Sequence, residues 1–88
     1  LQNHVGRYYL RLTVADLPGV VAEIGTILRD EGVSMESLIQ RGHHGSSGVF
    51  FVLTTHETRE EAIMKTIAKL ESHDLVLAPP VMLRIKAL

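Results

Sequence analysis

The sequence predicts an α+β domain in which a four-stranded antiparallel sheet carries both of its helices on one face. Strand-like and helix-like apolar patterns follow one another in the order strand, helix, strand, strand, helix, strand over the 88 residues. Each helix then crosses between two parallel strands, and such crossovers are right-handed in nearly all proteins. This order is typical of the ferredoxin-like βαββαβ sandwich.

The first strand and the first helix are predicted on either side of one short turn. Apolar and polar side chains alternate over residues 7–14, as in a half-buried strand. Pro18 suits the first helical position, and Gly32 suits the left-handed residue that follows a helix. Gly25 is expected to let the helix approach the sheet closely. Helical spacing predicts one apolar face made of Val20, Val21, Ile24, Ile27 and Leu28.

The second half of the chain contains a predicted hairpin, a helix and a last strand. Residues 33–41 alternate imperfectly, which a bulge near Ser37 would explain, and residues 42–48 are expected to be a flexible connection. Residues 49–55 are apolar on both faces, as in a central strand. Thr58 and Glu61 match a capping box, and the apolar face of the helix that follows holds Ala62, Ile63, Met64, Ile67 and Leu70. The last strand region, 75–86, contains two prolines, so it is expected to start irregularly or to lie at an edge.

Composition argues against several classes of function. The formal net charge is −1 and cysteine is absent, so we expect no basic surface for nucleic acid or anionic membranes and no thiolate metal site. No apolar run reaches the roughly 20 residues of a membrane span. We therefore expect a cytoplasmic protein. Hydrophobic residues make up 45% of this small chain, which favours a homodimer or higher homo-oligomer in which another copy covers apolar surface.

The domain organisation expected from the sequence is simple. Residues 1–6 are polar and unpatterned, as in the end of a linker, and residues 7–88 form one domain. Because the chain begins with Leu1, we expect it to be a piece of a longer protein. It contains no strand followed by a Gly-x-Gly-x-x-Gly turn, so no dinucleotide cofactor is expected to bind to it.

The turn at residues 16–20 is the candidate binding site. Backbone N–H groups at a helix start, here those of Gly19 and Val20, can hold a carboxylate, and the Asp16 side chain can pair with an ammonium group. An amino acid carries both groups, so the turn suits a small zwitterion. The competing interpretation is that Asp16 only caps the helix, an interaction worth roughly 0.5–2 kcal/mol.

These patterns resemble those of an ACT domain. The resemblance rests on residues 8–14, on the Asp-x-Pro-Gly turn that begins at Asp16, and on residues 33–37, and it covers nearly the whole chain. More narrowly, residues 8–12 and 34–40 resemble the C-terminal ACT domains of bacterial homoserine dehydrogenases. The resemblance implies two domains paired through their sheets and an amino-acid effector bound at their interface. For this branch of the family it implies L-threonine as that effector.

The resemblance also implies which residues bind the effector. Asp16, Leu17, Pro18, Gly19 and Val20 of one copy would form one wall, and Leu38, Ile39 and Gln40 on the second strand of a partner copy would form the other. Gln40 could bond a ligand hydroxyl or carboxylate, or simply face solvent. Catalytic residues and an NAD(P) site would lie N-terminal to this chain, so none is expected within it.

Other functions find less support in the sequence. His43 and His44 are adjacent between glycines, without a well-spaced third ligand, so no metal site is expected. Ser46 and Ser47 lie in the same glycine-rich segment, which offers no fixed base for hydrolysis. RNA recognition would need a basic motif around an exposed aromatic residue, which the chain lacks. An acylphosphatase-like site would need a positioned Asn, and Asn3 is the only one. The remaining rival is a dimerisation module that binds no ligand.

Overall fold

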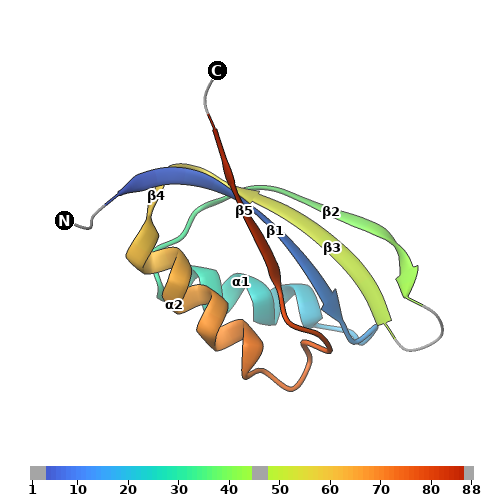
Figure 1. Cartoon of the computed structure of the whole chain (residues 1–88). Helices are drawn as coiled ribbons and strands as arrows, with labels where there is room; N and C mark the ends of the chain where they lie inside the picture. The colour runs from blue at the N-terminus through green and yellow to red at the C-terminus, as the bar shows by residue number, and fades with distance from the viewer. Residues whose placement is uncertain (1–3, 45–47, 87–88) are drawn as a thin grey trace.

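The computed structural model describes residues 4–44 and 48–86, which form one antiparallel sheet with two helices on one of its faces (Figure 1). Apart from the additional two-residue strand β4, the elements follow the predicted order and are β1 (Val5–Val14), α1 (Val20–Asp30), β2 (Met35–His44), β3 (Gly48–Thr55), β4 (Thr58–Arg59), α2 (Glu60–Glu71) and β5 (Val81–Ile85). The predicted α+β class and βαββαβ order are therefore confirmed.

Strand pairing places β1 and β3 at the centre of the sheet. β3 pairs with β2 on one side and with β1 on the other, and β5 pairs with β1 opposite Arg7–Arg11. The two-residue strand β4 also pairs with β1, at Val5 and Gly6, so the sheet has five strands and not four. β1 begins at Val5, two residues before the strand that the sequence predicts, because of this pairing.

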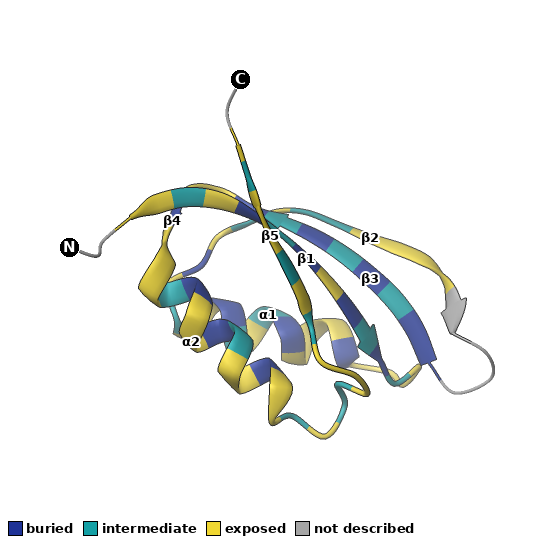
Figure 2. Cartoon of the chain, viewed as in Figure 1, coloured by how far each residue is buried: buried dark blue, intermediate teal, exposed yellow. Residues whose placement is uncertain are grey.

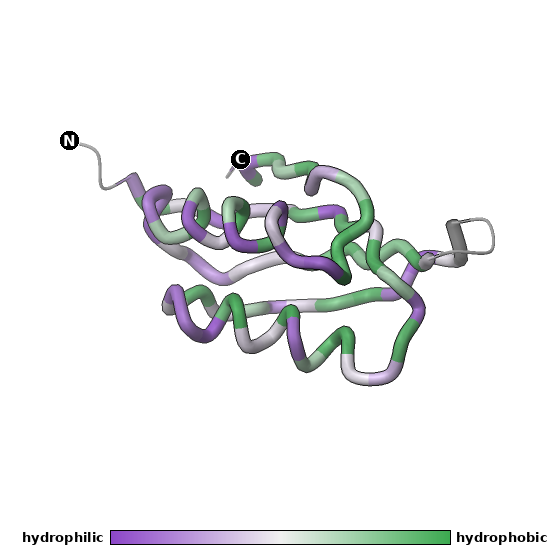
Figure 3. Tube along the Cα trace, turned by 90° about the horizontal axis from the view of Figure 1, so that it is seen from below, coloured by the Kyte–Doolittle hydropathy of each residue, from purple (hydrophilic) through white to green (hydrophobic). Residues whose placement is uncertain are grey.

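The core lies between the sheet and the helices and is almost entirely aliphatic. Figure 2 shows buried residues at intervals along β1, β3 and both helices. Seen from the helix side, hydrophobic and hydrophilic residues alternate along both helices (Figure 3). The alternation predicted for β1 is confirmed, because Tyr8, Leu10, Leu12 and Val14 are all buried. The other buried apolar residues are Val20, Ile24, Leu28, Val33, Val49, Phe51, Leu53, Ile63 and Leu70.

Some residues predicted on the buried faces of the helices are exposed to solvent. Val21 and Met64 are 42% and 48% exposed, and Thr66 is fully buried in the place of an apolar residue. Thr66 tolerates burial because its hydroxyl donates to the Ala62 carbonyl at 2.9 Å. The expectation for Gly25 is wrong as well, since no heavy atom lies within 4 Å of the position that a Cβ would occupy there.

The ends of the two helices differ in how well the sequence predicts them. Gly32 has φ 73°, its N–H donates to Arg29, and the Val33 N–H donates to Leu28, which is the Schellman arrangement expected after α1. The capping box predicted for α2 is wrong. Thr58 pairs with Gly6 in β4, the N-cap is Arg59, and no side chain caps the helix. Tertiary pairing with β1 has displaced the local cap.

The β2–β3 hairpin confirms one prediction and corrects another. The register shifts between Met35 and Ser37, as expected for a bulge near Ser37. A second shift lies between Gln40 and His43, where Gly42 has φ 69°. The strands stay paired as far as His44 and Gly48, so much of the predicted flexible connection is strand. The rest of that prediction, residues 45–47, lies outside the described residues.

Candidate functional site

The turn between β1 and α1 is a type II β-turn over residues 17–20. The Val20 N–H donates to the Leu17 carbonyl at 3.3 Å. Gly19 has φ 87° and ψ −4°, as the third residue of a type II turn requires, and proline is common at the second. Pro18 therefore lies in the turn and not at the first helical position, which belongs to Val20.

Asp16 does not cap α1. The N-cap is Gly19, no side chain caps this helix, and among the described residues the Asp16 carboxylate makes no hydrogen bond or ion pair. The interpretation of Asp16 as a cap is therefore wrong. Its carboxylate is exposed and unpaired within that part of the chain.

The turn presents backbone N–H groups and apolar surface beside that carboxylate. The first N–H groups of a helix lack partners inside it. The Val20 N–H, which the sequence offered as a donor to a ligand, already donates to the Leu17 carbonyl, so among the described residues the N–H groups at the helix start without such a bond are those of Val21 and Ala22. Leu17 is 53% exposed, whereas Val20 is 6% exposed and anchors the turn in the core. Within residues 4–44 and 48–86, no heavy atom outside the chain neighbours of Gly19 lies within 4 Å of the position that a Cβ would occupy there. The surface over the turn is therefore open to a ligand.

The segment that leads from α2 to β5 holds the base of the turn. The Ala15 N–H donates to Leu75 at 2.8 Å and the Leu77 N–H donates to Thr13 at 2.8 Å. Val14 and Val76 form an isolated bridge between these two bonds. The strand predicted from residue 75 is thus confined to β5, and residues 75–77 instead support the candidate site. Their consecutive apolar side chains were the only signal in the sequence.

The other predicted wall lies on a different strand of the same chain. Leu38 packs partly against the core, Ile39 is 51% exposed, and Gln40 is exposed. These residues pair with β3, which separates β2 from β1, so one chain does not bring them together with the turn. β2 pairs only with β3 among the described strands, and its outer edge faces away from the sheet (Figure 1). A second copy would be needed to combine the two sets.

Three grooves on the described surface lie away from the turn. One lies between the end of α1 and the start of α2, at Gly32 and Arg59. A second lies where β1 begins and β5 ends, at Gly6 and Arg84, and a third crosses the open sheet face at Arg11. None of these three includes a residue of the turn.

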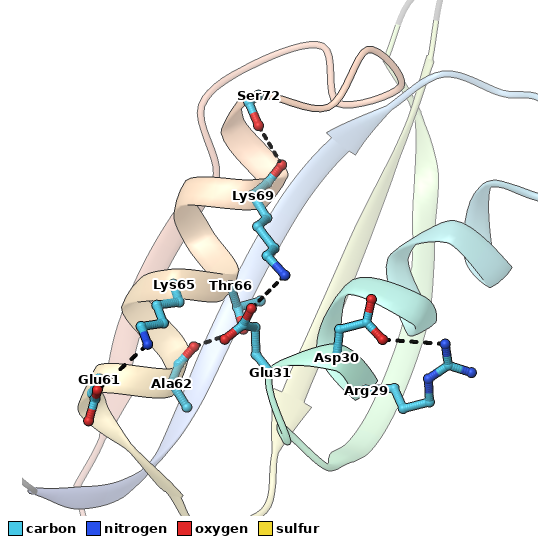
Figure 4. Close-up of polar contacts among 9 residues, drawn as sticks. All are labelled: Arg29, Asp30, Glu31, Glu61, Ala62, Lys65, Thr66, Lys69 and Ser72. Carbon is cyan, nitrogen blue, oxygen red and sulfur yellow. Dashed lines mark hydrogen bonds and ion pairs between the residues drawn. The ribbon is translucent and has the colours of Figure 1, made fainter.

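Two ion pairs that shift a pKa lie away from the candidate site. Lys69 on α2 contacts Glu31 at the end of α1 at 2.6 Å, and this hydrogen bond raises the pKa of Lys69 (Figure 4). On the sheet, the Arg7 guanidinium donates to Glu36 and lowers the pKa of that carboxyl group. Within the described residues, no cluster of three or more side chains could hold a metal ion. In the same part of the chain, neither helix has the length and hydropathy needed to cross a bilayer.

Comparison with known proteins agrees with this architecture. The family model of the ACT domain matches residues 8–72. A homoserine dehydrogenase of Neisseria gonorrhoeae is 40% identical over 81 residues, which cover 92% of this chain and 19% of the relative. The crystal structure of a homoserine dehydrogenase from Thiobacillus denitrificans superimposes with a TM-score of 0.85 at 33% identity, covering 97% of this chain and 18% of that one.

A more distant structure shares the fold alone. The regulatory subunit of aspartate kinase from Thermus thermophilus superimposes with a TM-score of 0.63 at 18% identity, over 93% of this chain and 54% of that one. The chain spans about one fifth of the length of the homoserine dehydrogenases that it matches. The family match covers most of the residues and the architecture agrees with it, so the chain belongs to the ACT domain family.

Proposed function

We propose that this chain is the amino-acid-sensing regulatory domain of a homoserine dehydrogenase and that it binds L-threonine between two paired copies. The observation that carries the proposal is the β1–α1 turn, where the Asp16 carboxylate, which has no partner among the described residues, lies three residues before the N-cap of α1. The ammonium group of the ligand pairs with this carboxylate. Its carboxylate group accepts hydrogen bonds from the helix-start N–H groups. The 40% identity to a homoserine dehydrogenase supports the choice of parent enzyme.

The partner copy completes the site in this proposal. Its β2 strand brings Leu38, Ile39 and Gln40 over the turn, where the Gln40 amide bonds the threonine hydroxyl, while Ile39, on the opposite face of the strand, packs against the other copy. The 51% exposure of Ile39 leaves apolar surface for this contact. Catalysis and NAD(P) binding belong to the part of the cytoplasmic enzyme outside this chain. Binding at the interface favours one arrangement of the pair, with a coupling of about 1–3 kcal/mol to the enzyme active site.

Titration calorimetry of the chain with L-threonine tests this proposal, with serine, methionine and lysine as competitors. Asp16→Asn should weaken threonine binding by about tenfold, because a charged hydrogen bond is replaced by a neutral one. The matched control is Glu71→Gln, which removes another exposed carboxylate, at the last residue of α2. Equal threonine affinity of the wild type and the Asp16 variant would contradict the pairing of this carboxylate with the ligand ammonium group.

A ligand-free dimerisation module is the second candidate, and one observation favours it. Exposed apolar side chains lie on the strands, including Ile39 on β2 and Leu83 on β5, the latter 58% exposed. Burying them against a second copy needs no effector. Analytical ultracentrifugation separates the two functions. A stable dimer that binds none of the four amino acids, and that Asp16→Asn leaves unchanged, supports the module and contradicts the sensor.

A further inference from the structure

A closed circuit of hydrogen bonds surrounds the β1–α1 turn and passes through one side chain from another part of the chain. Along the backbone, Val20 donates to Leu17, Leu17 donates to Ala15 at 3.0 Å, and Ala15 donates to Leu75 at 2.8 Å. The Leu75 N–H donates to His73 Nδ1 at 3.1 Å.

The circuit closes on the first turn of α1. His73 Nε2 lies 3.3 Å from Glu23 Oε1, and the Glu23 N–H donates to the Gly19 carbonyl at 3.0 Å. Glu23 therefore touches the turn through its backbone and the α2–β5 segment through its side chain. Leu75 and His73 are the links in this circuit that belong neither to the turn nor to α1, and His73 is the one that takes part through its side chain.

The backbone around His73 holds the imidazole in position. The His73 N–H donates to Leu70 at 3.1 Å, and the His73 carbonyl accepts from Val76 at 3.0 Å, so the residue is held on both sides at the end of α2. Its side chain is 27% exposed. Because Nδ1 accepts the Leu75 N–H, the proton of the neutral ring lies on Nε2, from which it points to Glu23.

We propose that His73 is a positioning residue for the effector site, with its Nε2–H tautomer setting where Ala15 and Asp16 lie relative to the start of α1. His73 touches no ligand. It acts through Leu75, whose carbonyl receives the Ala15 N–H directly before Asp16. The inference rests on the proposed binding of an amino acid at this turn, and it assigns to the α2–β5 segment a part in the affinity of that site.

Three variants distinguish the contributions of the two hydrogen bonds made by the imidazole, at Nδ1 and at Nε2. His73→Phe keeps a ring and removes both bonds. His73→Asn keeps an acceptor for the Leu75 N–H, since an Asn side chain can bond the backbone N–H two residues on. Glu23→Ala removes only the Nε2 arm, and Glu71→Ala is its control, because among the described residues the Glu71 carboxylate makes no ion pair.

Amide hydrogen exchange and threonine titration are measured on each variant of this chain, with urea unfolding to separate local from global effects. For His73→Phe we expect about tenfold faster exchange at Ala15 and Leu75 and about tenfold weaker threonine binding. His73→Asn should restore the Leu75 exchange rate. Glu23→Ala should weaken binding, whereas Glu71→Ala should not. Nitrogen NMR of the wild-type imidazole should show a protonated Nε2 and an unprotonated Nδ1.

Each other outcome overturns the inference. Unchanged exchange at Ala15 in His73→Phe shows that the circuit does not hold the turn. Faster exchange with unchanged threonine affinity shows that holding the turn does not serve binding. If the wild type binds no threonine, the proposed function fails together with the affinity part of this inference, and the exchange data separate that case because they need no ligand.

Discussion

Alanine substitutions at three glycines test the backbone of this domain, because the structure predicts opposite signs for chemically identical changes. Gly19 and Gly32 have φ values of 87° and 73°, whereas Gly25 lies inside α1. At all three positions a Cβ would meet no heavy atom within 4 Å. Steric clashes therefore do not contribute to the stability differences among the three variants, which depend only on backbone conformation.

The expected magnitudes follow from that conformation. A residue other than glycine in a left-handed conformation destabilises the folded state by roughly 1–2 kcal/mol. Replacing glycine also makes the unfolded chain less flexible, which stabilises the folded state by about 0.4–1 kcal/mol. Gly19→Ala and Gly32→Ala should therefore each destabilise by about 0.5–1 kcal/mol. Gly25→Ala should stabilise by about 0.5–1 kcal/mol, since alanine is the better helix former.

Urea unfolding with an unchanged m-value measures these differences. Destabilisation by Gly25→Ala would refute the reasoning, because it would show that α1 packs against another part of the molecule at that point. Stabilisation by Gly19→Ala would refute the left-handed turn. Comparing Gly19→Ala with Gly32→Ala also distinguishes an effect on stability from an effect on binding. Gly19→Ala should weaken threonine binding as well, whereas Gly32→Ala, at the other end of the helix, should not.

Three further predictions concern the core and the two ion pairs. Leu28→Ala removes a side chain that is 1% exposed and should cost about 2–5 kcal/mol in urea unfolding; a smaller loss would show that the core collapses around the site. Lys69→Met should lower the melting temperature at neutral pH. Because Glu31 raises the pKa of Lys69 from 10.5, the difference from wild type should persist below that value and vanish as the pH rises through the raised pKa. Glu36→Gln should also lower the melting temperature at neutral pH, but its difference from wild type should vanish at low pH. Arg7 lowers the pKa of Glu36 from 4.5, so its contribution is present above that value and is lost as the pH falls through the lowered pKa.

Controls for the ion pairs come from the same surfaces. Lys65→Met removes a looser pair, in which Lys65 Nζ lies 3.7 Å from Glu61 one helical turn away (Figure 4). Surface pairs of this kind contribute little, so its melting temperature should change less than that of Lys69→Met. A melting-temperature difference for Lys69→Met or Glu36→Gln that stays constant across the whole pH range would contradict the assigned ionisation.

The candidate site divides into a part that local sequence predicts and a part that it does not. The sequence places a turn at Asp16–Val20, because proline and glycine favour turn conformations whatever their surroundings. The roles within the turn were partly wrong: Pro18 lies before the helix, and Asp16 caps nothing. A type II turn and a capped helix start accept the same residue types, so the pattern alone could not choose between them.

The sequence by itself determined the order of the elements, the inner face of β1, the bulge near Ser37 and the glycine that ends α1. Each of these follows from the period of the apolar residues or from the φ preference of one residue, and both act over a few positions. Tertiary structure alone decided that Thr58 pairs with Gly6 and that His73 bridges Glu23 and Leu75. The Gly6–Thr58 pairing and the Glu23–His73 contact each join residues about 50 positions apart. No local pattern encodes such contacts, because they form only when the sheet and the helices pack together.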